Sequence, residues 1–288
     1  MYAITGITGN VGGAMARALL AAGQPVRAVV RDAAKGRGWA ALGCEIAVAH
    51  IEDVPALTAA FRGVTGAFVL PPAEFDPAPG FPEAKAINAA LSAALVAAQP
   101  SKVVCLSTIG AQAKQTNLLS QRTLLEQTLA SLPSAITFLR PAWFMENLAW
   151  DLEQAKNEGT ISCFLQPLER AFPMVATEDV GNYAAELIQQ TWTGPRVAEL
   201  EGPRPLTQHD IAHALSALLG RPIQPRAVPR ETWRTLFETQ GMKNPEPRIQ
   251  MLDGFNQGFI RFEGEPASIR KGKVELATVL TRLLRATS

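Results

Sequence analysis

Three glycines near the N-terminus have a spacing that could place a bound phosphate ligand. Gly6, Gly9 and Gly12 lie three residues apart, after the apolar run Tyr2–Thr5 and before the Ala/Leu-rich segment Ala14–Gly23. Gly6 would let the chain turn sharply, Gly9 would let the backbone approach a diphosphate, and Gly12 would let a helix pack on a strand. The helix N-terminus would then offer N–H groups to phosphate oxygens. An ordinary strand–turn–helix corner is the alternative, but a second strand follows directly and favours a dinucleotide site.

Basic residues follow at the end of that second predicted strand, Pro25–Val30. Arg31 occupies the tip, with Lys35 and Arg37 close behind. An acidic side chain at this position usually binds ribose hydroxyls, whereas an arginine can pair with a 2′-phosphate through its planar guanidinium. The sequence therefore predicts NADP(H) over NAD(H), although Asp32 is a residue of the kind that NAD(H) sites use.

Histidines and cysteines are the other candidate ligands and nucleophiles. His209 and His213 lie four residues apart on a predicted helix and could share one face, but no third ligand is near them in the sequence. Cys44, Cys105 and Cys163 are far apart in apolar runs, which is typical of buried free thiols. No metal site is predicted.

A regular alternation of strands and helices must position these residues. The predicted strands of this alternation are 2–5, 25–30, 44–49, 65–70, 102–108 and 135–140. The alternation predicts an α/β fold with a Rossmann-type, doubly wound parallel sheet. Asp53 is expected to cap the helix 54–61, with contact to an adenine as the alternative. The loop Pro71–Gly80 follows the fourth strand at its carboxyl end, where such sheets bind ligands.

The pattern becomes irregular after Pro141. The sequence predicts a helix at 143–156, a strand at 161–165, a helix to Gln190 with Thr177 as an N-cap candidate, a strand at 197–200, and helices at 208–219, 231–239 and 273–285. We therefore expect a dinucleotide-binding domain at 1–150, to which 173–200 returns. Residues 151–172 and 201–288 would form a smaller, mostly helical substrate lobe over the cofactor cleft.

Charge and composition argue against several classes of partner. The 288 residues include 27 Lys and Arg against 26 Asp and Glu, and 47% of them are hydrophobic. Such a balance does not suggest binding to nucleic acid or to an anionic membrane surface. No signal segment and no apolar run of membrane-spanning length is recognised, so a cytoplasmic protein is expected.

Several motifs together resemble those of NmrA-like proteins, which are atypical members of the short-chain dehydrogenase/reductase superfamily. The motifs are the glycine turn 4–12, the tip at Arg31, and the runs 106–111, 139–147, 175–181 and 200–207. The run 139–147, Leu-Arg-Pro-Ala-Trp-Phe-Met-Glu-Asn, is the most specific, and the resemblance covers most of the chain. Members of this family include NAD(P)H-dependent quinone and isoflavone-type reductases, and also regulators that bind NADP(H) without turnover.

The resemblance implies a set of cofactor-binding residues. The phosphate turn would be Gly6, Thr8, Gly9, Asn10, Val11 and Gly12, with Arg31 at the 2′-phosphate; Leu70, Pro71 and Pro72 would lie beside the ribose; Ser107 and Thr108 would lie near the nicotinamide; and Pro141, Phe144 and Asn147 would border the nicotinamide and the substrate. Simple core packing is the alternative for Trp143 and Phe144.

The chain departs from the superfamily in its catalytic acid. Ordinary short-chain dehydrogenases use Tyr-x-x-x-Lys, but neither Tyr2 nor Tyr183 has a lysine four residues on. Some NmrA-like reductases use a lysine on the helix after the fifth strand, and here 117–131 contains none, while Lys114 lies just ahead. Ser107 could hydrogen-bond a carbonyl, but a bond to the local backbone is the more common role. The catalytic residues therefore stay unassigned.

The missing acid shapes the predicted function. A quinone accepts hydride readily and its reduced oxygens can take protons from water, so position and orientation could suffice. The sequence thus favours NADPH-dependent reduction of a quinone-like or other electron-poor small molecule. The alternatives are an NADP(H) redox sensor acting through a protein partner and, less favoured without the Tyr/Lys pair, a sugar-nucleotide epimerase.

Overall fold

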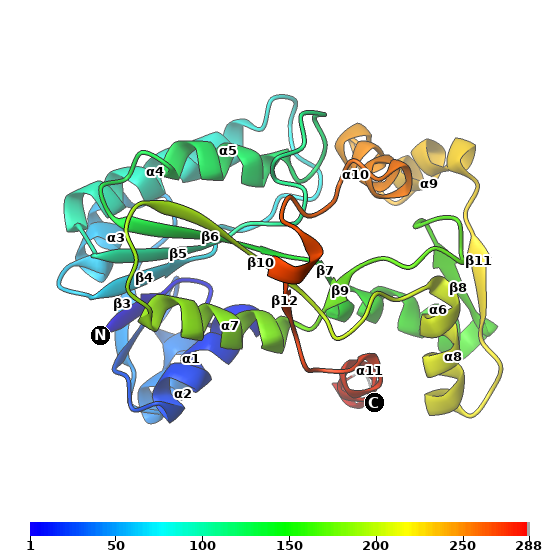
Figure 1. Ribbon diagram of the computed structural model, residues 1–288, viewed down its shortest axis with the longest axis horizontal. Helices are drawn as coiled ribbons and strands as arrows, with labels where there is room; N and C mark the ends of the chain where they lie inside the picture. Colours follow the sequence, from blue (N-terminus) through cyan, green and yellow to red (C-terminus); the bar gives the residue numbers. More distant parts are fainter. Residues whose placement is uncertain (287–288) are drawn as a thin grey trace.

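A computed structural model describes residues 1–286, and a large parallel sheet is its main element (Figure 1). From one edge to the other the strands are β12 (Arg270–Lys271), β10 (Pro195–Glu201), β6 (Ala135–Pro141), β5 (Lys102–Leu106), β4 (Gly66–Val69), β1 (Tyr2–Ile4), β2 (Val26–Val30) and β3 (Glu45–Val48). All neighbouring strands are parallel. The order β3-β2-β1-β4-β5-β6 is that of a doubly wound nucleotide-binding sheet, which confirms the predicted fold class.

Helices cover both faces of this sheet (Figure 1). One face carries α1 (Asn10–Ala21), α2 (Ala33–Ala41) and α7 (Thr177–Gln189), and the other carries α3 (Val54–Phe61), α4 (Pro82–Ala98) and α5 (Ser120–Leu129). The strands are buried on both faces because side chains alternate along them. Tyr2 and Ile4 pack into the core under α1 and α7, whereas Ala3 packs into the core under α3, α4 and α5.

Glycine stops and an aspartate cap set several helix ends of the sheet domain, as predicted. Gly23 and Gly43 adopt φ values of +69° and +88° just after α1 and α2. These left-handed conformations are readily available to glycine, and they stop the helices. The Asp53 carboxylate accepts a hydrogen bond from the Ala56 N–H, which confirms the predicted cap of α3.

A second body of smaller elements lies beyond the carboxyl end of the sheet (Figure 1). It comprises β7 (Trp143–Phe144), η1 (Met145–Asp151), α6 (Leu152–Glu158), β8 (Thr160–Cys163), β9 (Met174–Val175), α8 (Gln208–Leu219), β11 (Gln224–Ala227), η2 (Arg230–Thr232), α9 (Trp233–Thr239), α10 (Glu246–Gln257), η3 (Pro266–Ser268) and α11 (Leu276–Ala286). Two further core clusters hold it together, one around α8 and α11 and one around α9 and α10. Within residues 1–286, no helix is both long and apolar enough to cross a membrane.

The structure differs from the sequence prediction at several places after Pro141. The expected helix at 143–156 is instead β7, the 3₁₀ helix η1 and α6, because Trp143 and Phe144 pair with β9. The N-cap of α7 is Ala176 rather than Thr177. The helix α10 was not predicted, since it begins after Pro245, contains a second proline and is rich in polar residues.

Candidate functional site: a glycine turn at the sheet edge

The turn between β1 and α1 has the geometry of a phosphate-binding corner. Gly6 has a φ of +64°, and the Gly9 N–H donates to the Gly6 carbonyl at 3.0 Å. A Cβ atom on Gly12 would lie 2.4 Å from the Gly6 carbonyl oxygen, so only glycine permits this approach of α1 to the turn. Val11 is buried beside Gly12 and holds the helix on the sheet.

The N-terminus of α1 fits an anionic ligand. Gly9 is the N-cap and provides no side-chain hydrogen bond, and the first turn contains no acidic residue. Thr8, Gly9 and Asn10 are exposed. The N–H groups of the first helical turn and the positive end of the helix dipole are therefore available to a diphosphate.

Thr5 joins this turn to the end of β4. Its hydroxyl donates to the Phe68 carbonyl at 3.2 Å and accepts from the Leu70 N–H at 2.8 Å. The Leu70 side chain lies so near Gly6 that a Cβ there would be 2.8 Å from it. The structure thus brings the predicted cofactor residue Leu70 against the glycine turn, with Pro71 buried and Pro72 exposed just beyond.

Arg31 lies exposed at the carboxyl end of β2, the strand next to β1. Within residues 1–286 its guanidinium has neither an ion pair nor a hydrogen bond. Asp32, by contrast, accepts a hydrogen bond from the Ala34 N–H at 2.8 Å and caps α2. The acidic residue beside the tip therefore has a structural role, and the guanidinium stays available to a phosphate.

The carboxyl ends of β5 and β6 carry a buried charged network. The Ser107 hydroxyl donates to the Glu126 carboxylate at 2.5 Å, and Arg140, only 5% exposed, binds both oxygens of Glu126 at 2.9 and 2.7 Å. Arg140 also donates to Glu263 at 2.7 Å. Burial alone would lower the pKa of Arg140, but its hydrogen bonds and charge pairs with the two carboxylates outweigh burial and raise it. The hydroxyl proton of Ser107 is thus held by Glu126, and the half-buried Thr108 is the next hydroxyl along this edge.

The run 139–147 combines cofactor candidates with structural residues. Pro141 is buried at the end of β6, Phe144 packs partly buried against the core under α1, and Asn147 is half-buried in η1. The Glu146 carboxylate accepts hydrogen bonds from the Thr177 N–H at 2.9 and 3.0 Å and from its hydroxyl. Glu146 therefore caps α7 from a distant part of the chain. In the sequence, the only signal for Glu146 was its place in the specific motif 139–147.

Arg122 is a further residue near the carboxyl ends of the strands, and the sequence did not reveal its role. From the partly exposed face of α5 its guanidinium donates to the Pro71 carbonyl at 2.9 Å. Arg122 lies on the helix after the fifth strand, which contains no lysine, and it binds the loop after β4. Lys114 is exposed.

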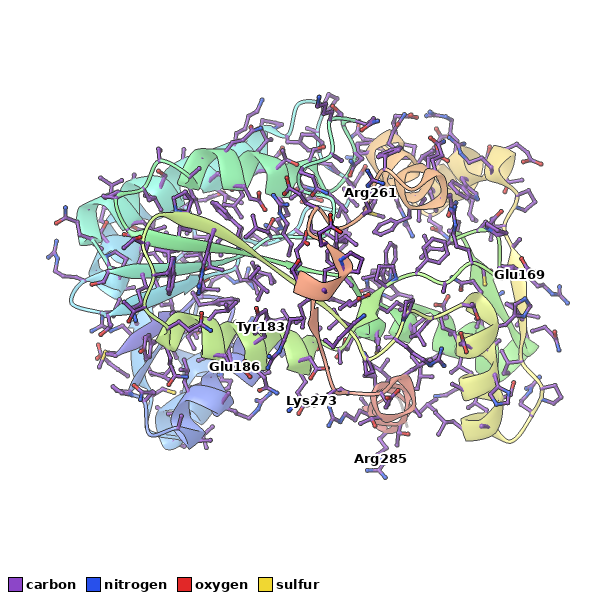
Figure 2. The ribbon with its side chains drawn as sticks, viewed as in Figure 1. Glu169, Tyr183, Glu186, Arg261, Lys273 and Arg285 are labelled. Atoms are coloured by element: carbon purple, nitrogen blue, oxygen red, sulfur yellow. The ribbon has the colours of Figure 1, made fainter. Side chains whose placement is uncertain are left out.

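Neither tyrosine belongs to the hydrogen-bond network of Ser107, Glu126 and Arg140. Tyr2 is buried in β1, and Tyr183 lies on α7 (Figure 2). Burial raises the pKa of Tyr183, whereas an acid–base tyrosine needs a lowered one. Cavities of about 330 and 320 Å³ flank Tyr183, and none of the predicted cofactor residues lines either of them.

Thiols and imidazoles are dispersed over the described part of the chain. Cys44, Cys105 and Cys163 are buried and free, as predicted, and burial raises the pKa of the Cys163 thiol to about 12. His209 lies 3.6 Å from the Glu169 carboxylate. The described part of the chain contains no cluster of three potential metal ligands.

Several known proteins are similar to this chain over most of its length. The family model of the NmrA-like family matches residues 2–259. The NAD(P)H azoreductase of Xenophilus azovorans is 30% identical over 89% of this chain and 85% of its own length, and quinone oxidoreductase 2 of Escherichia coli is 27% identical over 88% and 85%. A solved structure of an NADPH-dependent quinone oxidoreductase from Escherichia coli with NADPH has a TM-score of 0.81 and 22% identity, and the match covers 99% of this chain and 100% of that one. The structure of the Citrobacter triphenylmethane reductase with NADP(H) has a TM-score of 0.80 and 19% identity, and the match covers 98% of this chain and 99% of that one. At these identities the structural matches show the fold.

Proposed function

The chain belongs to the NmrA-like family, and from this premise we propose that it is an oxidoreductase that uses NADPH to reduce a quinone-like or other electron-poor small molecule. The observation that carries the proposal is the glycine turn. A diphosphate fits the uncapped N-terminus of α1, and the available Arg31 guanidinium at the end of the neighbouring strand fits the additional phosphate of NADP(H).

The relatives support both the cofactor and the class of acceptor. Their names give azo compounds, quinones and triphenylmethane dyes as substrates, and NADPH or NADP(H) as the bound nucleotide. These acceptors share an extended conjugated system that takes up hydride easily. The acceptor of this chain is proposed within that class.

In the proposed chemistry, the main task of the protein is to position the nucleotide and the acceptor. The bound nucleotide would supply a hydride, and a quinone that takes up this hydride and one proton from water becomes a hydroquinone. The chain would hold the nucleotide through the glycine turn and Arg31. The fixed ends of β4, β5 and β6 would orient the acceptor, because Thr5, Arg122 and the Arg140 network immobilise them.

Stopped-flow oxidation of NADPH with a panel of quinones and azo dyes tests the proposal. We expect rapid loss of NADPH that requires both the protein and an acceptor. If NADPH binds but no acceptor in the panel accelerates its oxidation, the oxidoreductase proposal is wrong. In that case the redox-sensor alternative would predict a protein partner whose binding differs between NADPH and NADP⁺.

A further inference from the structure

Two exposed aromatic side chains contact each other across two separate segments of the chain. Phe75 lies in the loop after β4 and is 58% exposed, and Trp150 lies in η1 and is 66% exposed. Their ring centroids are 6.2 Å apart with an interplanar angle of 86°. The other aromatic pairs, such as Trp143–Phe255, are packed in the core around α9 and α10. Large adjacent aromatic rings in solvent usually mark a surface that binds something.

The backbone around Phe75 is fixed on both sides. Gln121 Nε2 donates to the Glu74 carbonyl at 2.8 Å. The Asp76 carboxylate accepts hydrogen bonds from the N–H groups of Lys243 and Asn244 at 2.8 and 2.7 Å. Phe75 is therefore exposed on a loop that hydrogen bonds anchor to α5 and to the segment before α10.

Trp150 is held equally firmly. The neighbouring residues Leu148 and Leu152 are 7% and 2% exposed, and both belong to the core around α8 and α11. The leucines on either side of Trp150, one in η1 and one at the start of α6, are therefore buried, whereas Trp150 is exposed. Both aromatic rings are presented by rigid backbone, so little entropy is lost when they bind a ligand.

The two segments that carry the pair begin beside predicted cofactor residues. Phe75 follows Leu70 by five residues and Trp150 follows Phe144 by six, so neither can be more than about 22 Å from those residues along the chain. The two segments leave the carboxyl ends of β4 and β6, which are the ends where parallel sheets bind ligands. Neither ring carries a charge, so the pair can select for flatness and conjugation.

We propose that Phe75 and Trp150 form a specificity-determining aromatic pair that stacks on the planar, electron-poor ring system of the acceptor. This inference rests on the proposed function, because it assigns residues to the acceptor of that same site. The electron-rich indole of Trp150 suits an electron-poor ring, and the phenyl ring of Phe75 supports the indole edge to face. Acceptors with two fused rings gain more from this contact than acceptors with one ring.

Binding and turnover are measured separately to test the pair. The NADP⁺-saturated protein is titrated calorimetrically with a one-ring benzoquinone and a two-ring naphthoquinone, and NADPH oxidation is followed with both. Phe75→Leu and Trp150→Leu are each expected to weaken naphthoquinone binding about 5- to 10-fold and benzoquinone binding less. Trp150→Phe should restore most of the affinity. Val96→Ala, an exposed apolar residue of α4, is the matched control and should change neither.

The outcomes separate the two proposals. Naphthoquinone binding that is absent in the unmodified protein, or equal in the unmodified protein and both leucine variants, would overturn the aromatic pair. An altered oligomeric state in the variants with unchanged quinone binding would also overturn it, since the pair would then be a contact between copies. Quinone binding without any NADPH oxidation would reject the proposed function and leave the pair in place.

Discussion

At the residue scale, the proposed preference for NADP(H) rests on the side chain of Arg31. We expect Arg31→Ala to weaken NADPH binding by about 1.5–3 kcal/mol and NADH binding far less, because a charge-assisted contact to the 2′-phosphate is lost. Arg37→Ala is the control, since Arg37 is also exposed but lies in α2 beyond the strand tip. Calorimetric titration of both nucleotides measures the difference. Equal losses for NADPH and NADH would remove Arg31 as the discriminating residue.

Asp151 makes stability depend on pH. Burial raises the pKa of its carboxyl from 3.8 to about 6, so the folded state binds the proton more tightly than the unfolded state. The resulting penalty is absent below about pH 4, grows between about pH 4 and pH 6, and levels off above pH 6 at about 3 kcal/mol. Asp151→Asn should therefore stabilise the protein at pH 8 and have little effect at pH 4.

Urea unfolding of this variant at the two pH values measures the effect. The control is Glu153→Gln, which changes an exposed carboxyl two residues away. A gain in stability that is equal at pH 4 and pH 8 would show that the Asp151 carboxyl does not titrate differently in the folded protein.

At the scale of elements, the start of α1 depends on the absence of a side chain at position 12. Gly12→Ala would force a Cβ to within 2.4 Å of the Gly6 carbonyl, and we expect a loss of stability of about 1–3 kcal/mol together with weaker NADPH binding. Gly38→Ala is a matched control in α2, where a Cβ meets nothing within 4 Å. Thermal unfolding and nucleotide titration of both variants measure the difference, and two indistinguishable variants would contradict the assigned packing role.

Most of the sheet elements could be predicted from local pattern. Their apolar runs and glycine stops act within a few residues, as Gly23 and the Asp53 cap illustrate. The cap of α7 could not be predicted, because Glu146 and Thr177 are 31 residues apart in the sequence. The same holds for one of the two carboxylate partners of Arg140, since Glu263 is 123 residues away.

The candidate site was likewise predictable only in part. The glycine spacing and the basic tip were visible in the sequence, and their assignment to a cofactor stays a prediction. The bond between Ser107 and Glu126 and the Phe75–Trp150 contact were not visible, because both depend on side chains that tertiary packing brings together.

At the scale of the whole molecule, carboxylates on the sheet domain hold the C-terminal segment 263–274. Glu199 accepts hydrogen bonds from the Glu263 and Gly264 N–H groups, and Asp179 accepts from Lys273 and Val274 at 2.9 and 2.8 Å. This segment passes through η3 and β12 and leads to α11 (Figures 1 and 2). It therefore connects the smaller body to the edge of the large sheet.

We expect Asp179→Asn to lower the free energy of unfolding by about 1–2 kcal/mol, because the Lys273 and Val274 N–H groups both donate to Oδ2 and lose the negative charge of their acceptor. Hydrogen exchange at Lys273 and Val274 should accelerate. Glu178→Gln is the neighbouring control, since its exposed pair with Arg282 contributes about 0–1 kcal/mol. Unchanged exchange in Asp179→Asn would mean that the segment is held by other contacts.

The central claim is that the glycine turn and Arg31 bind NADP(H), and calorimetric titration of the folded, unmodified protein with NADPH tests it most directly. The predicted result is saturable binding of one NADPH per chain, with weaker binding of NADH. A folded protein that gives no binding signal with either nucleotide would contradict the claim.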